Sequence, residues 1–184
     1  MNYLTILGII VIVIILYYII KYLFSGGTLT STSSAKKTIT ISSDNVANTA
    51  NFTYSIWFYI DNWNYKFGID KTILTKGNKN VEINLGKEEN NLNIAIELES
   101  KTKKTHNCNV PNIPIQKWVS CIISVYGRSL DVYINGKLVR TCILENVAKL
   151  NDGDIQITPN GGFSGYTSNF QFIPDATNPE EAYN

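Results

Sequence analysis

The chain has 184 residues, 44% of them hydrophobic and 17% charged, a length that suggests one domain with or without an appendage. Sixteen basic residues against fifteen acidic ones give a net charge of +1 and a pI near 7.6. A nucleic-acid-binding domain usually has a clustered basic face and a high pI, so nucleic acid is excluded as the expected partner. The single histidine, His106, argues against a multi-histidine metal site and a histidine-based catalytic triad.

The first 24 residues are typical of a membrane anchor. Residues 4–20 carry no charged side chain, and Lys21 is the one charge before residue 25. At about 1.5 Å per residue, a helix of roughly 20 residues spans a hydrocarbon core of about 30 Å. We therefore expect a transmembrane helix over residues 1–24 that contacts the lipid bilayer, with anchoring residues that include Leu4, Ile10, Ile15 and Ile20.

A cleaved signal peptide is the alternative, but no Lys or Arg precedes the apolar run, and the run is long for such a segment. Lysines flank the segment on its C-terminal side only, at Lys21, Lys36 and Lys37. The positive-inside rule then predicts a single-pass protein with its C-terminal domain on the cytosolic face. One N-glycosylation sequon, at 51–53, points to the opposite side.

Residues 25–37, SGGTLTSTSSAKK, have the composition of a flexible linker. From residue 38 onward the hydrophobic pattern has a period of two, and no segment has a convincing helical period. We expect strands over 38–41, 52–60, 72–74, 81–85, 92–98, 119–125, 130–134, 137–140, 154–157 and 165–172. About ten short strands in some 145 residues predict an all-β antiparallel sandwich or barrel over 38–184.

The clearest local signal is Asn135-Gly136 between two alternating runs, which predicts a two-residue type I′ hairpin. Such a turn fixes the strand register. It would place Val132 opposite Val139, Asp131 opposite Arg140 and Tyr133 opposite Leu138.

Several motifs occur together: FTYSIWF at 52–58, ILTKG at 73–77, Trp118, LDVYINGKL at 130–138, IQITPNGGFSG at 155–165, FQF at 170–172 and PEEAY at 179–183. Together they resemble the laminin-G-like branch of the concanavalin A-like lectin/glucanase superfamily. The resemblance implies a jelly-roll β-sandwich and does not specify an activity. The anchor and the PEEAY ending resemble membrane-anchored members encoded by nucleocytoplasmic large DNA viruses, many of which are virion proteins.

Glucanases of this superfamily carry an E-x-D-x-x-E motif on one strand, with the outer carboxylates at the spacing of a retaining glycosidase. The chain has no such motif. Glu97 and Glu99 are its nearest imitation, and they are better explained as the solvated face of a strand. His106 and Cys108 would share a face if extended, yet no third catalytic group accompanies them. The sequence therefore predicts a protein that is not an enzyme.

The three cysteines, at 108, 121 and 142, are too few and too widely spaced for a disulfide framework. Cys121 and Cys142 are expected to be small buried side chains on strands separated by 130–134, so a direct bond between them is not expected. A bond from Cys108 to either one stays open if the domain is luminal.

Two loops contain Asp and Asn side chains of the kind that bind calcium, one at 61–64 and one at 151–160. In the second loop, Asp152, Asp154 and Asn160 are candidate calcium ligands, although Asn-Asp-Gly-Asp is also an ordinary turn sequence. No other cofactor is expected.

A carbohydrate or partner site would combine exposed aromatic rings with Asp and Asn side chains. The candidate residues are Asp61, Asn62, Trp63, Tyr65 and Tyr166. The alternative for Trp63 is that it plugs the open end of the sandwich, and Trp57 and Trp118 are expected in the core.

These observations lead to two hypotheses. The first is a membrane-anchored structural protein that docks onto a protein partner and links the inner membrane of a virion to its capsid proteins. The second is a glycan-binding ectodomain.

Overall fold

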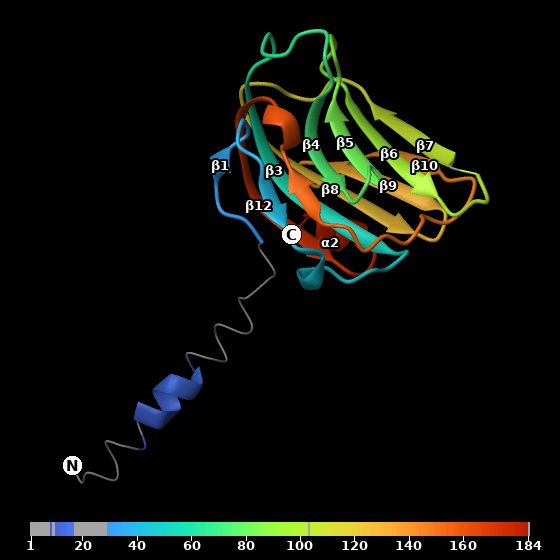
Figure 1. The fold of residues 1–184 in the computed structure, drawn as a ribbon. Helices are drawn as coiled ribbons and strands as arrows, with labels where there is room; N and C mark the ends of the chain where they lie inside the picture. Colours follow the sequence, from blue (N-terminus) through green and yellow to red (C-terminus); the bar gives the residue numbers. More distant parts are fainter. Residues whose placement is uncertain (1–7, 9, 17–28, 103, 184) are drawn as a thin grey trace.

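The computed structural model describes residues 8, 10–16, 29–102 and 104–183. Within these residues, two six-stranded antiparallel sheets pack face to face (Figure 1). Sheet A has the order β1-β12-β3-β8-β9-β10, and sheet B has the order β2-β11-β4-β5-β6-β7. The strands are β1 (Ser33–Ser34), β2 (Ile39–Ile41), β3 (Phe52–Asn62), β4 (Lys71–Lys76), β5 (Val81–Leu85), β6 (Leu92–Leu98), β7 (Lys104–Val110), β8 (Trp118–Tyr126), β9 (Ser129–Ile134), β10 (Lys137–Ile143), β11 (Ile155–Ile157) and β12 (Ser164–Ile173).

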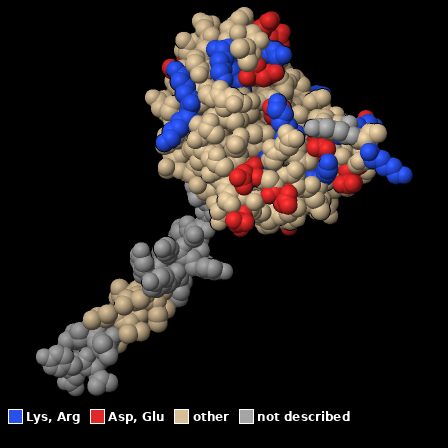
Figure 2. Space-filling model, in the orientation of Figure 1, with Lys and Arg blue, Asp and Glu red and all other residues tan. Residues whose placement is uncertain are grey.

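After residue 29 the described chain also contains three short helical elements: the 3₁₀ helices η1 (Ser43–Asn45) and η2 (Pro159–Gly161) and the helix α2 (Pro179–Tyr183). The predicted all-β jelly-roll sandwich is confirmed, and β5 and β6 have the predicted bounds. Basic and acidic side chains are interspersed with uncharged surface on the face drawn in Figure 2.

The core lies between the two sheets and follows from the alternation of side chains along each strand. Sheet A contributes large buried rings, which include Tyr54, Phe58 and Phe170. Sheet B contributes aliphatic side chains, which include Ile83 and Ile94. Phe58 meets Phe163 edge-on, with ring centroids 6.3 Å apart, so aromatic packing closes the core between β3 and the start of β12.

The hairpin at Asn135-Gly136 forms as predicted, with φ of 51° and 74° at its two central residues. Tyr133 pairs with Leu138, but a bulge between Leu138 and Arg140 shifts the register after that pair. Arg140 therefore lies opposite Val132. The predicted pairs Val132–Val139 and Asp131–Arg140 are wrong because a bulge adds one unpaired residue to its strand, which a turn sequence does not reveal.

The sandwich begins earlier in the chain than predicted. Ser33 and Ser34, inside the expected linker 25–37, pair with Thr167 and Tyr166 of β12, and Ala35 is fully buried. Leu29 donates its amide to the carbonyl of Phe170 at 2.7 Å. The chain from Leu29 to Ala35 therefore runs along β12 of sheet A, and residues 25–28 lie outside the described residues.

Residues 10–16 of the predicted anchor are helical, and their apolar side chains, including Ile10 and Ile15, are about half exposed. The described residues contain no helix with the length and apolar character needed to cross a bilayer. Leu4 and Ile20 lie in the ranges 1–7 and 17–24, outside the described residues, so the transmembrane span stays a prediction.

A disulfide joins Cys108 of β7 to Cys142 of β10. These are edge strands of the two sheets, so the bond ties sheet B to sheet A along one side of the sandwich. A bond from Cys108 to Cys142 is one of the alternatives that the sequence left open. The expectation that Cys142 is a buried side chain is wrong, because it lies on an edge strand and is only partly buried. Cys121 is the free cysteine, and burial raises the pKa of its thiol to about 12.

We expect reduction of the Cys108–Cys142 bond to lower the free energy of unfolding by about 3–4 kcal/mol, because a bond across 34 residues restricts the unfolded chain. Urea unfolding of the full chain, with and without reductant, measures the difference. The double variant C108A/C142A is the control and should not respond to reductant. Equal midpoints for the wild-type protein in both conditions would contradict the expectation.

Candidate functional site

Strand β3 divides its side chains between two faces. Ile56, Phe58 and Ile60 are buried in the core, whereas Trp57 is 39% exposed and Asp61 is exposed on the outer face of sheet A. Because side chains alternate along a strand, Tyr59 lies on the same outer face as Trp57. The central strand of sheet A thus builds both the core and an aromatic surface.

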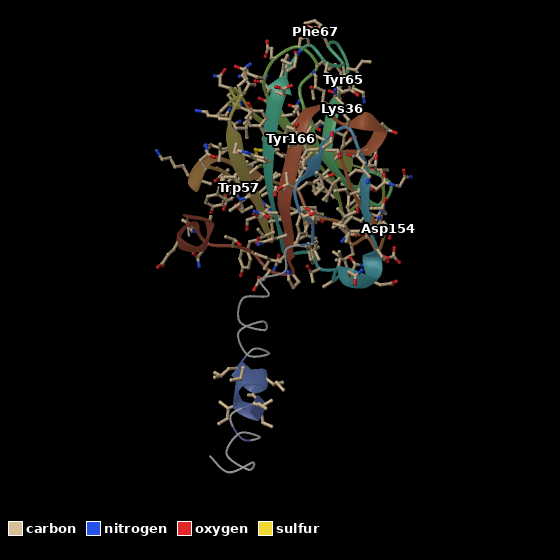
Figure 3. The ribbon with its side chains drawn as sticks, turned by 90° about the vertical axis from the view of Figure 1, so that its left-hand side faces the viewer. Lys36, Trp57, Tyr65, Phe67, Asp154 and Tyr166 are labelled. Carbon is tan, nitrogen blue, oxygen red and sulfur yellow. A yellow bond between two sulfur atoms is a disulfide. The ribbon has the colours of Figure 1, made fainter. Side chains whose placement is uncertain are left out.

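Neighbouring strands extend this surface. Tyr59 lies opposite Tyr166 of β12 and opposite Trp118 of β8, with ring centroids 6.4 Å and 5.9 Å apart respectively. Trp118 is 41% exposed and Tyr166 is 49% exposed. We call Trp57, Tyr59, Trp118 and Tyr166 the aromatic patch; Figure 3 shows Trp57 and Tyr166 on the side that faces the viewer.

Two adjoining hollows lie over the aromatic patch and share Thr32 and Trp118. The larger, of about 470 Å³, is also lined by Tyr59, Asp61 and Tyr166. The smaller, of about 300 Å³, is also lined by Trp57, Ser168 and Asn169.

The other end of this face is covered by the chain itself. Thr53 of β3 donates its hydroxyl to the carbonyl of Asp175 at 2.8 Å. The amide of Thr177 donates to Ser124 Oγ at 2.9 Å, and Thr53 is fully buried. The C-terminal segment thus occupies the outer face near the start of β3 and leaves the aromatic patch open.

Of the five predicted site residues, the structure brings Asp61 and Tyr166 into one hollow. Asn62 accepts a hydrogen bond from the Asn64 amide at 2.8 Å, as in an Asx turn. The hydroxyl of Tyr65 donates to the Gly161 carbonyl at 3.1 Å, and Lys36 Nζ lies 4.7 Å from its ring centroid. Asn62 and Tyr65 therefore hold the loop after β3 in place and line neither hollow.

Trp63 lies apart from the aromatic patch and is held by other residues. It packs against the core, its indole N–H donates to the Glu88 carbonyl at 2.9 Å, and Lys71 Nζ lies 4.5 Å from its ring. Lys71 is 1% exposed and donates to the carbonyls of Gly86 and Lys87. Burial lowers the pKa of this amine, and Asp70 opposes the shift. These contacts favour the interpretation that Trp63 closes one end of the sandwich.

The candidate calcium ligands lie in the chain on either side of β11 (Ile155–Ile157). Asp154 accepts a hydrogen bond from the Ser43 amide at 2.9 Å. Asn160 lies beyond the other end of β11, a strand of three residues that is about 10 Å long. The carbonyl of Asn160 accepts a hydrogen bond from Lys66 Nζ. The described residues contain no group of three or more acidic, histidine or cysteine side chains that could hold a metal ion. Calcium binding by Asp152, Asp154 and Asn160 stays a prediction.

The groups weighed for catalysis are engaged elsewhere. Cys108 is oxidised and therefore provides no thiol beside His106. Glu97 is 7% exposed and pairs with Lys149 Nζ at 2.8 Å. The expected solvated face is therefore wrong for Glu97, because Lys149 and Asn80 cover its carboxylate.

Sequence reasoning missed Tyr59, Trp57 and Trp118 as site residues. Trp57 and Trp118 were expected in the core because they are large aromatics within strands. The period of two along 52–60 contains the correct signal, since residues of odd number cannot share the face of Phe58. No sequence pattern indicates that Thr32 lines the hollows, because its position depends on the pairing of β1 with β12.

The sandwich, its buried ring-rich core and its open aromatic face define a lectin-like domain. Residues 33–182 match the family described as the concanavalin A-like lectin/glucanases superfamily. The chain belongs to this superfamily. The comparison with curated proteins finds no match.

Solved structures with the same fold include binding domains of botulinum neurotoxins. The serotype D ligand-binding domain in complex with N-acetylneuraminic acid is 16% identical, with a TM-score of 0.67 over 85% of this chain and 42% of that one. The receptor-binding domain of the C/D mosaic serotype is 17% identical, with a TM-score of 0.64 and the same coverage. The DC binding domain in complex with rat synaptotagmin II is 18% identical, with a TM-score of 0.56 over 72% and 34%.

At these identities the likeness shows the fold alone, and the chain spans about two fifths of the length of the first two neighbours. The domain is thus a lectin-type sandwich whose structural neighbours are binding domains.

We expect Gly165→Ala to disrupt the aromatic patch. A Cβ at Gly165 would collide with the carbonyl oxygen of Tyr59, where β12 passes close to β3. The substitution should cost more than about 1 kcal/mol of stability and change the near-UV circular dichroism, because Tyr59 and Tyr166 must move. Gly68→Ala is the control, since it has positive φ but its added Cβ meets nothing within 4 Å. Similar thermal midpoints for the two variants would contradict the argument.

Proposed function

We propose that the protein is a non-enzymatic, membrane-tethered binding module whose aromatic patch binds carbohydrate. The observation that carries this proposal is the open hollow in which Tyr59, Trp118 and Tyr166 surround an exposed carboxylate, Asp61. The apolar faces of sugar rings pack on aromatic rings, and a carboxylate accepts hydrogen bonds from sugar hydroxyls. A few aromatic anchors beside one polar group are typical of a small-molecule site.

The comparisons support a binding function. The superfamily contains lectins, and one structural neighbour, the serotype D toxin domain, was solved with N-acetylneuraminic acid. The E-x-D-x-x-E motif of its glucanases is missing from this chain, which supports binding without catalysis.

We expect Trp118→Ala to weaken glycan binding about 30-fold, because truncation of a central aromatic anchor typically costs about 2 kcal/mol. Isothermal titration of the full chain in a polyoxyethylene detergent, which has no sugar headgroup, measures the effect for a glycan selected on an array. Tyr126→Ala is the matched control, since Tyr126 is 67% exposed at the opposite end of the same strand. Equal losses for both variants would contradict a site at the aromatic patch.

The membrane side of the domain is part of the proposal. The lysines that follow the apolar segment predict that the domain lies on the cytosolic face. Disulfides, in contrast, persist mainly in oxidising compartments and are rare in the cytosol. Because Cys108 and Cys142 are bonded, we favour the extracytosolic side, which is also the side where glycans are displayed.

A topology experiment tests this choice. In membranes from expressing cells, we expect a denatured, non-reduced sample to react with polyethylene-glycol maleimide at Cys121 alone and a C-terminal tag to resist external protease. Cys121→Ser, which should abolish labelling, is the control. Three labelled cysteines and a digested tag would place the domain in the cytosol.

That outcome would favour a second proposal, in which the domain links the inner membrane of a virion to its capsid. The observation in favour is an exposed apolar pair, Phe67 and Ile69, 58% and 59% exposed in the loop after β3. Figure 3 shows Phe67 at one extremity of the sandwich. Phe67 follows the end of β3, whereas Leu29 bonds to Phe170 of β12 near the start of β3. An apolar tip at the end of the sandwich away from Leu29 fits a protein partner.

A further inference from the structure

The charge around the aromatic patch limits the class of glycan. Among the described residues that line the two hollows, Asp61 is the sole charged side chain. Asp61 makes no hydrogen bond or ion pair with another described residue, so both carboxylate oxygens are available to a ligand. An acidic sugar would face this carboxylate without a compensating Lys or Arg, and like charges repel.

The extent of the aromatic patch limits the length of the glycan. Tyr166, Tyr59 and Trp118 form one row across β12, β3 and β8, and neighbouring strands are about 4.8 Å apart. The second hollow continues from Trp118 to Trp57 on the same face. A ligand that covers the row and reaches Trp57 must be longer than one sugar ring.

The ring orientations limit the form of the glycan. The plane of Tyr59 is tilted by 55° to that of Trp118 and by 51° to that of Tyr166. Rings at these angles cannot lie flat against a planar surface such as a crystalline polysaccharide. They can each contact one residue of a single chain that twists along its length.

Hydrogen-bonding groups are placed beside the rings. Thr32 and Ser168 bond to each other at 2.8 Å, so these hydroxyls are already partly used. Asp61 is then the principal acceptor in the larger hollow. Hydroxyl groups that donate to a carboxylate form strong, charge-assisted hydrogen bonds.

We infer that the ligand is a neutral oligosaccharide of two or more residues, bound as a single soluble chain across β12, β3 and β8, with Asp61 accepting hydrogen bonds from its hydroxyl groups. This inference rests on the proposed carbohydrate-binding function. It differs from an expectation drawn from the toxin domain, whose bound N-acetylneuraminic acid is anionic.

The test uses an array of matched pairs, each a neutral oligosaccharide and its sialylated form, for example lacto-N-neotetraose with and without a terminal sialic acid. Titration of the full chain in a polyoxyethylene detergent then gives Kd values for the selected pair and for its constituent mono- and disaccharides. We expect the sialylated form to bind at least tenfold more weakly than the neutral form, and the monosaccharide at least tenfold more weakly than the tetrasaccharide.

Two variants locate the effect. Asp61→Asn should weaken binding of the neutral glycan and reduce its advantage over the sialylated form. Asp70→Asn is the matched control: Asp70 is an exposed acid paired with Lys87 outside the aromatic patch, and its substitution removes the same charge. It should change neither Kd. A thermal melt of each variant confirms that it is folded.

The outcomes separate the two proposals. If no glycan of either charge binds, the carbohydrate-binding function itself is wrong. If glycans bind but the sialylated form binds as well as the neutral form, or a monosaccharide binds as well as the tetrasaccharide, the function stands and this inference is overturned. Equal effects of Asp61→Asn and Asp70→Asn would also overturn it.

Discussion

The alternation of side chains along β3 links the stability of this domain to its aromatic patch. Phe58 packs inward against Phe163, and the residues on either side of it, Trp57 and Tyr59, face outward. A shift of one residue in the pairing of β3 would exchange the two sets, bury a carboxylate and expose the core. The aromatic patch is therefore held in place by the same register that builds the core.

Two further features keep that register. Gly165 lets β12 approach the Tyr59 carbonyl, which brings Tyr166 next to Tyr59. The Cys108–Cys142 bond ties the two sheets together at the opposite side of the sandwich, where both end in edge strands. The C-terminal segment covers the outer face of sheet A near Thr53 and Ser124, outside the aromatic patch.

The sequence predicted the strands and the sandwich well, because hydrophobic periodicity and turn chemistry are local. It predicted the site only in part. Asp61 and Tyr166 are 105 positions apart, and their meeting depends on the pairing of β12 with β3. The bulge in β10 depends on side-chain fit against β9, and the disulfide depends on how the two sheets stack; no local pattern encodes either. Trp57 and Trp118 were misplaced because residue type was weighed above strand position.

The place of Thr32 has a mechanical consequence. It lines both hollows and lies three positions after Leu29, which is bonded to β12. A pull on a bound ligand would reach the preceding chain through β1 and its two-residue pairing with β12. Most of the sandwich, including the disulfide-bonded edge, lies outside that load path. Tension would therefore separate the first few residues of the domain from β12 before it strained the core.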